Sequence, residues 1–214
     1  MVLNDERLRE GLEFLARRDG KLAALLIDLG PPPIWAREPG FATLLHIILE
    51  QQVSLQSARA AFERLLEALD PITPERFLTL GDEHLKQIGF SRQKTSYGRA
   101  LARSIVEGAL DLGSLESMND QQVAYELMKV KGIGRWTADI YLLMALGRAD
   151  VWPAGDLALQ VAVERIHNLK RRPTPQELNE ISRGWRPWRA VAARLLWHYY
   201  LTCEKPRGPR RASA

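Results

Sequence analysis

The most informative stretch of this sequence reads Leu127-Met128-Lys129-Val130-Lys131-Gly132-Ile133-Gly134-Arg135-Trp136-Thr137-Ala138. It predicts the end of one helix, a Gly-x-Gly turn and the start of a second helix. Two glycines permit positive φ angles and leave no side chain over the backbone, so a phosphate can approach the amides at the start of the second helix. Ile133 is expected to anchor the turn inward. From the two glycines alone, a plain structural turn explains the stretch equally well.

Beyond this stretch, the hydrophobic pattern predicts an all-α protein. Apolar residues recur at helical spacing, and period-two alternation of β-branched residues is nearly absent. Proline and glycine breakers divide the chain into roughly ten short helices. The predicted apolar stripes are Leu55, Ala58, Phe62, Leu65, Leu66 and Leu69; then Tyr97, Leu101 and Ile105; and, on a long final helix, Trp188, Ala192, Leu195, Tyr199 and Cys203.

Composition excludes several classes of protein. The 214 residues are 46% hydrophobic, which is ample for a core. The single cysteine, Cys203, excludes a disulfide framework, a four-cysteine zinc site and an iron–sulfur cluster. The four histidines show no close ligand spacing, so no catalytic metal is expected; they are His46, His84, His167 and His198. No secretory signal and no run of about eighteen apolar residues occurs, so we expect a protein that acts inside the cell and away from membranes.

The net charge gives only weak support for a polyanionic partner. The formal charge is +4, and four basic residues fall in the last ten positions: Lys205, Arg207, Arg210 and Arg211. The remainder of the chain carries 26 basic and 26 acidic residues and is therefore near neutral. The tail fits a disordered end as well as it fits a DNA-binding arm.

The segment from Val130 to Ala138 resembles the hairpin of the helix-hairpin-helix (HhH-GPD) DNA glycosylase superfamily. Those enzymes carry an aspartate about twenty residues downstream after a loop of Gly/Pro character, and here Val151-Trp152-Pro153-Ala154-Gly155-Asp156 places Asp156 22 residues after Gly134. Further segments resemble the AlkA-type 3-methyladenine DNA glycosylase II branch: Ile48 to Ser54, Gly89 to Lys94, Trp185 to Arg189, and Trp197. The resemblance spans residues from about 35 to about 200.

The resemblance implies a two-lobed, all-α DNA glycosylase fold with the active site in the cleft between the lobes. One lobe is expected to combine residues 1–40 with 151–214. The other is expected to comprise residues 41–150 and to contain the helix-hairpin-helix at about 127–147. Too few residues precede Phe41 for the N-terminal β domain of AlkA. We therefore expect a compact form of the fold.

The resemblance also implies an activity, which is monofunctional base excision in DNA repair. The enzyme would hydrolyse the N-glycosidic bond of alkylated purines, such as 3-methyladenine and 7-methylguanine, flipped out of duplex DNA. Asp156 would stabilise the oxocarbenium-like transition state or activate water. From the residues alone, Asp156 is also explained as the N-cap of a helix that begins at Leu157, and both roles can hold together.

Trp136 favours a monofunctional glycosylase over a bifunctional one. It stands where bifunctional members carry a Schiff-base lysine, and an indole cannot form an imine. A bifunctional glycosylase/AP lyase therefore ranks lower. So does a non-catalytic helix-hairpin-helix module that only binds DNA, because such a module has no use for the Asp156 loop together with an aromatic pocket.

The resemblance assigns the remaining site residues to a base pocket and a DNA-binding surface. The pocket residues are Trp136, Trp197 and Tyr141. Stacking on an indole ring stabilises a cationic base through a cation–π interaction of about 0.5–2 kcal/mol. Each tryptophan is also explained as a core residue. Gln52 falls at the position that plugs the duplex, with Gln51 beside it, although a helix-capping role explains this pair too. The remaining DNA contacts are Lys131, Gly132, Ile133, Gly134 and Thr137.

The expected partner is double-stranded DNA that contains damaged bases, bound by a monomer. No cofactor is expected. The hairpin carbonyls of relatives can hold a monovalent cation beside a phosphate, and the sequence leaves that point open. The location expected is the cytoplasm of a bacterium or archaeon, or the nucleus of a eukaryote.

Overall fold

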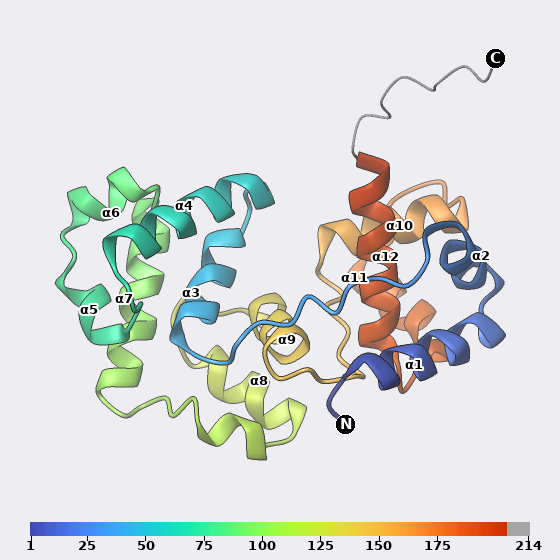
Figure 1. Ribbon diagram of the computed structural model, residues 1–214, viewed down its shortest axis with the longest axis horizontal. Coiled ribbons are helices and arrows are strands. Elements are labelled where there is room, and N and C mark those ends of the chain that lie inside the picture. The colour runs from blue at the N-terminus through green and yellow to red at the C-terminus, as the bar shows by residue number, and fades with distance from the viewer. Residues whose placement is uncertain (205–214) are drawn as a thin grey trace. The chain divides into compact units, whose positions relative to one another are not determined.

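The computed structural model describes residues 1–204, which are helical apart from short connections (Figure 1). The basic tail residues from Lys205 to Arg211 lie outside the described residues. The elements are α1 (Asp5–Arg18), α2 (Gly20–Leu29), α3 (Phe41–Glu50), α4 (Leu55–Ala68), α5 (Pro74–Thr79), α6 (Asp82–Ile88), α7 (Arg92–Val106), η1 (Ser114–Ser117), α8 (Asp120–Met128), α9 (Arg135–Met144), α10 (Leu157–His167), α11 (Pro175–Ile181), η2 (Ser182–Trp185) and α12 (Arg189–Glu204).

The prediction of an all-α protein is confirmed. Residues 1–204 form twelve α-helices and two 3-10 helices, and β pairing within this range is limited to an isolated bridge between Val2 and Arg148. More helices form than were expected because α5, α6 and α11 are only six or seven residues long. Such segments are too short to display helical periodicity. None of the described helices is both long and apolar enough to span a membrane.

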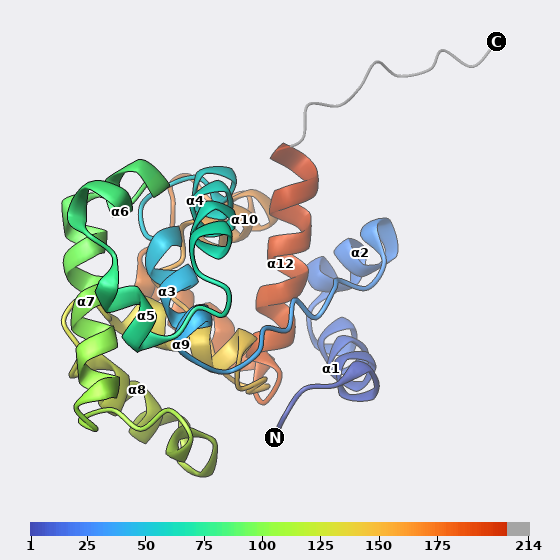
Figure 2. The same cartoon turned by 60° about the vertical axis from the view of Figure 1, so that its left-hand side comes forward.

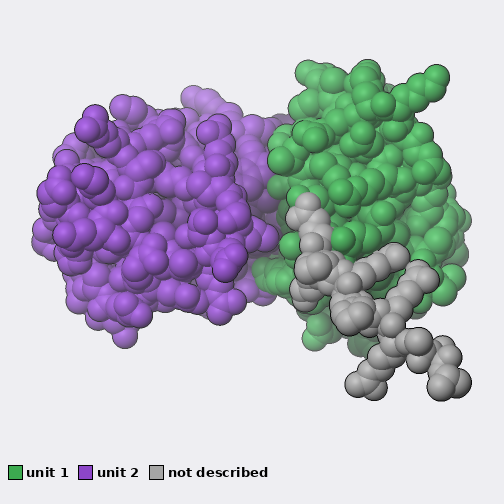
Figure 3. All heavy atoms as spheres, turned by 90° about the horizontal axis from the view of Figure 1, so that it is seen from above, with its two compact units in different colours: residues 1–35, 147–214 green, residues 36–146 purple. Residues whose placement is uncertain are grey.

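The chain divides into two compact units (Figure 3). Unit 1 comprises residues 1–35 and 147–214, and unit 2 comprises residues 36–146. The sequence placed these boundaries near residues 40 and 150. The candidate catalytic residue Asp156 therefore belongs to unit 1, whereas the whole Gly-x-Gly hairpin belongs to unit 2.

The central helix of unit 2 is α3. It is apolar almost throughout, and its buried side chains are Phe41, Leu44, Leu45, Ile47, Ile48 and Leu49. A helix with apolar residues on most sides needs neighbours on most sides, and α4, α7 and α9 pack against it (Figures 1 and 2). Gly98 allows α7 to approach closely, because a Cβ at this position would lie 2.9 Å from side-chain atoms of Leu45 and Phe77.

The apolar stripe of α4 is narrower than predicted. Ala58 and Leu65 are buried as expected, but Leu55 and Leu66 are 57% and 41% exposed. Leu55 is the first residue of the helix, and Leu66 lies about 100° around the helix axis from Leu65. Only the stripe that contains Ala58, Ala61 and Leu65 is buried. Counting apolar residues overestimated how much of this helix faces the core.

Unit 1 is built around α12, and both ends of the sequence contribute to it. Residues 190–197 of α12 are all buried, and α1, α2 and α10 pack against this helix. Gly11 brings α1 close to α12, because a Cβ there would lie 2.9 Å from Cγ2 of Val191. The first residues of the chain bond to the segment that begins at Gly147: the Leu3 N–H donates to the Gly147 carbonyl at 2.7 Å.

One titratable side chain, His46, is embedded in unit 2. Its ring stacks on Phe62 with centroids 4.1 Å apart, and its Nε2 lies 3.7 Å from a carboxylate oxygen of Glu50. Burial lowers the pKa of His46 below its ordinary value of 6.5; Glu50 opposes the shift and Arg37 adds to it. The folded state therefore favours the neutral ring.

Acidification is expected to weaken unit 2 through His46. The unfolded chain takes up this proton at pH values near 6.5, before the folded chain does. The free energy of unfolding should therefore fall as pH drops from 6.5 toward the lowered folded-state pKa, and should be insensitive to His46 above that range. Urea unfolding at about pH 7 and about pH 5 should show a smaller loss in His46→Asn than in the wild type. Equal losses would contradict this account.

Candidate functional site

The Gly-x-Gly stretch forms a helix-hairpin-helix motif within unit 2. Helix α8 begins with a capping box between Asn119 and Gln122 and ends at Met128, and α9 begins after Gly134. Within the turn, Val130 and Ile133 are each only 5% exposed. This burial confirms the predicted inward anchoring of Ile133. It also means that only the backbone of Ile133 is available at the surface of the hairpin.

Gly132 is required by the protein's own packing. Its φ is +95°, a conformation that side chains with a Cβ rarely adopt. A Cβ at this position would lie 2.1 Å from Cγ of Tyr97 in α7. Backbone conformation and close packing therefore both demand glycine here. Tyr97 was predicted to lie in an apolar stripe of its helix, and its contact with the hairpin was not predicted.

Gly134 differs from Gly132 because nothing within the described chain requires it. Its φ is −97°, and no atom lies within 4 Å of where a Cβ would stand. The first intrahelical bond of α9 runs from the Ala138 N–H to the Gly134 carbonyl. The amides of residues 135–137 precede that bond at the positive end of the helix dipole, which is the geometry of an anion site. Lys131 is exposed on the same turn.

Gln51 and Thr137 brace the hairpin from inside unit 2. The Gln51 Nε2 donates at 2.9 Å both to the Gly132 carbonyl and to the Thr137 hydroxyl. Thr137 is only 1% exposed. The DNA-binding role of these two residues stays a prediction, and in this structure the Gln51 amide and the Thr137 hydroxyl bond to each other. The Gln51 amide connects the end of α3 to the turn, a contact between segments 81 residues apart in sequence.

Gln52 occupies a strained and exposed position between α3 and α4. Gln51 is extended, with φ −61° and ψ 122°, and Gln52 then adopts a φ of +56°. The left-handed conformation costs a non-glycine residue about 1–2 kcal/mol. Such strain is concentrated at functional positions. The plugging role of Gln52 stays a prediction, and the turn presents its side chain to solvent.

The two predicted pocket residues of α9 lie in different environments. Trp136, the second residue of the helix, is partly exposed. Tyr141 is fully buried, and its hydroxyl accepts a hydrogen bond from the Gly40 N–H at 3.0 Å. Burial raises the pKa of this hydroxyl above its ordinary value. Tyr141 is therefore packed in the core of unit 2 and bonds to the start of α3, and its assignment to a substrate pocket stays a prediction.

Asp156 is held at the start of α10 in unit 1. It is the N-cap of that helix, and its Oδ1 accepts a hydrogen bond from the Leu159 N–H at 3.0 Å. The same oxygen accepts a second hydrogen bond, also 3.0 Å, from the indole Nε1 of Trp197 in α12. Asp156 is 9% exposed. The N-cap interpretation is confirmed, but an N-cap has no need of a tryptophan donor from another helix.

Trp197 orients the Asp156 carboxylate. Its ring is 7% exposed and makes an edge contact with Trp35, with centroids 6.4 Å apart and planes 69° apart. The predicted contact of Trp197 with a flipped base stays a prediction. The hydrogen bond to Asp156 and the contact with Trp35 were not found by sequence reasoning, because no local pattern relates α10, α12 and the segment before α3.

Trp197→Phe is expected to reduce, by about ten-fold, the rate of a reaction in which Asp156 takes part. This is the effect expected when a charged group loses one hydrogen bond. Phenylalanine keeps most of the ring packing but removes the indole N–H. The binding affinity for the substrate should stay unchanged, so the effect should fall on the rate at saturation. Trp35→Phe is the matched control, because it changes the neighbouring ring without altering the bond to Asp156. Equal effects of the two substitutions would contradict the positioning role.

The chemistry available to these groups is that of a fixed carboxylate and a backbone anion site. A carboxylate held by two N–H donors can stabilise a developing cation or accept a proton from water. Among residues 1–204, no group of three or more His, Cys, Asp or Glu side chains is placed to hold a metal ion.

Known proteins resemble this chain over most of its length. The family described as HhH-GPD superfamily base excision DNA repair protein matches residues 45–187. DNA-3-methyladenine glycosylase 1 of Schizosaccharomyces pombe is 27% identical over 181 residues, which are 83% of this chain and 79% of that protein. YfjP of Bacillus subtilis is 29% identical over 184 residues, which are 82% of this chain but only 64% of that protein.

The solved structures include a similar chain bound to DNA. The 3-methyladenine DNA glycosylase Mag1 of Schizosaccharomyces pombe, in complex with abasic DNA, matches with a TM-score of 0.84 at 27% identity. The match covers 88% of this chain and 95% of that chain.

Proposed function

Because the chain belongs to the HhH-GPD superfamily of base excision DNA repair proteins, we propose that it is a monofunctional DNA glycosylase. The proposed substrates are alkylated purines, such as 3-methyladenine and 7-methylguanine, in duplex DNA. The names of the Schizosaccharomyces pombe relatives support this substrate class. The observation that carries the proposal is the Asp156 carboxylate, buried and fixed by the Leu159 and Trp197 N–H groups.

The proposed reaction is hydrolysis of the bond between C1′ of deoxyribose and the purine nitrogen. An N-alkylated purine carries positive charge, so it departs as a neutral base with the electrons of that bond. Positive charge then develops on the sugar, and Asp156 stabilises it. Water supplies the oxygen that bonds to C1′, and its proton passes to Asp156 or to solvent. The balance requires only water, and the proposed reaction uses no cofactor.

DNA binding in this proposal depends on unit 2. The backbone amides at the start of α9 bind a phosphate, which can approach closely because Gly134 has no side chain. Gln52, exposed at a strained turn, fills the gap left by the extruded nucleotide. The carbonyls of residues 130 and 132 each accept one hydrogen bond and retain a second lone pair. We propose that these carbonyls can hold a monovalent cation beside that phosphate, and no step of the reaction uses it.

We further propose that the protein acts as a monomer on DNA with damaged bases. It would act in the cytoplasm of a bacterium or archaeon, or in the nucleus of a eukaryote. Trp136 cannot form an imine with the sugar, so the proposed product is an intact strand with an abasic site.

A strand-cleavage assay tests the reaction type. The full chain is incubated with a duplex that carries one alkylated purine, and the products are separated with and without alkali. Nicks should appear only after alkali treatment, and borohydride should trap no protein–DNA adduct. Nicking without alkali together with a trapped adduct would overturn the monofunctional assignment.

A further inference from the structure

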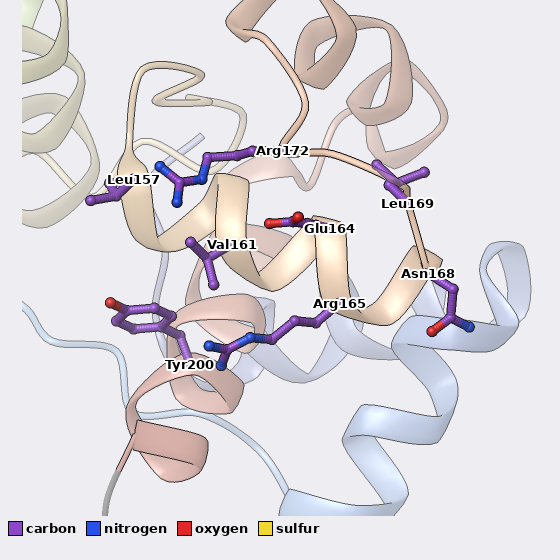
Figure 4. Close-up of a pocket in the computed structure, with 8 residues that line it drawn as sticks. All are labelled: Leu157, Val161, Glu164, Arg165, Asn168, Leu169, Arg172 and Tyr200. Atoms are coloured by element: carbon purple, nitrogen blue, oxygen red, sulfur yellow. The ribbon is translucent and has the colours of Figure 1, made fainter.

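A second candidate binding surface lies in unit 1, along the outer face of α10 (Figure 4). Here a hollow of about 580 Å³ is bounded by α10, the segment that follows it and Tyr200 of α12. The opposite face of α10 carries the residues buried in the core of unit 1, namely Leu159, Ala162 and Val163. None of the functions proposed above for Asp156 or the hairpin uses this hollow.

Two arginines line the hollow, Arg165 and Arg172. Among the side chains that the structure describes, no carboxylate lies within ion-pair distance of Arg165 or Arg172. By contrast, the neighbouring Arg171 is bound by both carboxylate oxygens of Glu177, at 2.7 and 3.0 Å. Figure 4 shows the Arg172 guanidinium directed toward Leu157, and the Arg165 guanidinium directed toward Tyr200.

The charge and chemistry of the hollow favour a nucleic acid backbone. Glu164 also lines the hollow, so two cationic groups and one anionic group leave it net positive. Val161 supplies apolar surface between the two guanidinium groups, and Leu157 supplies apolar surface beside that of Arg172. Cations beside apolar surface suit a chain in which phosphates alternate with sugars.

The position of the hollow relates it to Asp156. Leu157, the first residue of α10, lines the hollow and directly follows Asp156. From Leu157 to Arg165 the helix rises about 12 Å. A strand whose damaged sugar lies at Asp156 would place its next nucleotides along α10.

We propose that the hollow binds the sugar–phosphate backbone of the damaged strand beside the extruded nucleotide, with Arg165 and Arg172 contacting phosphates. This inference rests on the proposed function, because it takes Asp156 as the reacting centre. Phosphate contacts carry no sequence information. Their effect is therefore to position the strand, equally for damaged and undamaged DNA.

The salt dependence of DNA binding tests the proposal. DNA binding by the full-length wild type and by Arg165→Ala/Arg172→Ala is measured by fluorescence anisotropy, at salt concentrations between about 50 and about 200 mM. Two duplexes are used: an undamaged one, and the same duplex carrying a tetrahydrofuran abasic site. The double alanine variant should bind both duplexes about ten-fold more weakly. The slope of log affinity against log salt should become shallower by about 2. Arg165→Lys/Arg172→Lys should keep the wild-type slope because it keeps both charges.

A matched control separates local contact from overall charge. Arg9→Ala/Arg17→Ala removes the same two charges from exposed positions of α1 and should leave the slope unchanged. An unchanged slope in the α10 variant, or an equal change in the α1 control, would overturn the proposal. Base release by the wild type, measured in parallel, separates the two hypotheses. If the wild type releases no base but the slope of log affinity against log salt is still shallower in the α10 variant, the hollow binds DNA and the proposed function has failed.

Discussion

Asp156→Asn should reduce the single-turnover rate of base release by about 10³-fold, the loss expected when a transition-state charge loses its partner. The amide of asparagine has nearly the shape of the carboxylate but no charge. Its oxygen can still accept the hydrogen bonds from the Leu159 and Trp197 N–H groups. Asparagine is also as good an N-cap as aspartate, so the free energy of unfolding should change by no more than about 0.5 kcal/mol. The rate is measured with protein in excess over an alkylated duplex.

Two further measurements separate a catalytic role of Asp156 from a role in folding or DNA binding. Thermal unfolding and affinity for an abasic duplex should match the wild type, since the hairpin is unaltered. Asp156→Ser keeps a side chain able to cap α10 but removes the carboxylate, and it should be as inactive as the asparagine variant. Retention of wild-type activity by either variant would reduce Asp156 to a helix cap.

Gly132→Ala should lower the free energy of unfolding by about 3 kcal/mol or more, the sum of a left-handed backbone penalty and an overpacked contact. The φ of +95° disfavours alanine, and its Cβ would lie 2.1 Å from the Tyr97 ring. Urea denaturation followed by circular dichroism measures the loss. Adding Tyr97→Ala to Gly132→Ala should relieve the clash but not the backbone penalty.

Gly134→Ala is the matched control for Gly132, because its Cβ would meet no atom within 4 Å and its φ is ordinary. Its free energy of unfolding should change by less than about 1 kcal/mol, whereas its affinity for DNA should fall, because the methyl group occupies the path of the phosphate. Destabilisation by Gly134→Ala as large as that by Gly132→Ala would contradict the distinction drawn between the two glycines.

The hairpin and the Asp156 loop could be predicted because their signals are local. Glycines within a short turn, a helix start after Gly134 and an aspartate before Leu157 all lie within a few residues of the feature they specify. The burial of Ile133 follows from the same turn. The family resemblance supplied the chemical role proposed for Asp156, which its N-cap position alone does not reveal.

The contacts of the predicted site residues that sequence reasoning missed join distant segments. Gln51 and Thr137, which were both assigned to DNA, bond to each other across 86 residues of sequence. The hydroxyl of Tyr141, which was assigned to the pocket, accepts a hydrogen bond from the Gly40 N–H, 101 residues earlier. No spacing rule relates such partners, because the packing of whole helices brings them together. The same reason explains why the arginines of the α10 hollow were not singled out.

The central claim is that this chain removes alkylated bases, and direct detection of the released base tests it. Wild-type protein is incubated with a duplex containing one 7-methylguanine or 3-methyladenine, and the free base is quantified by chromatography and mass spectrometry, with Asp156→Asn as the blank. The account predicts free base in stoichiometric amount from the wild type, none above background from the variant, and an abasic strand cut only by alkali. Tight binding of the duplex without release of base from either substrate would contradict the claim and leave a DNA-binding module.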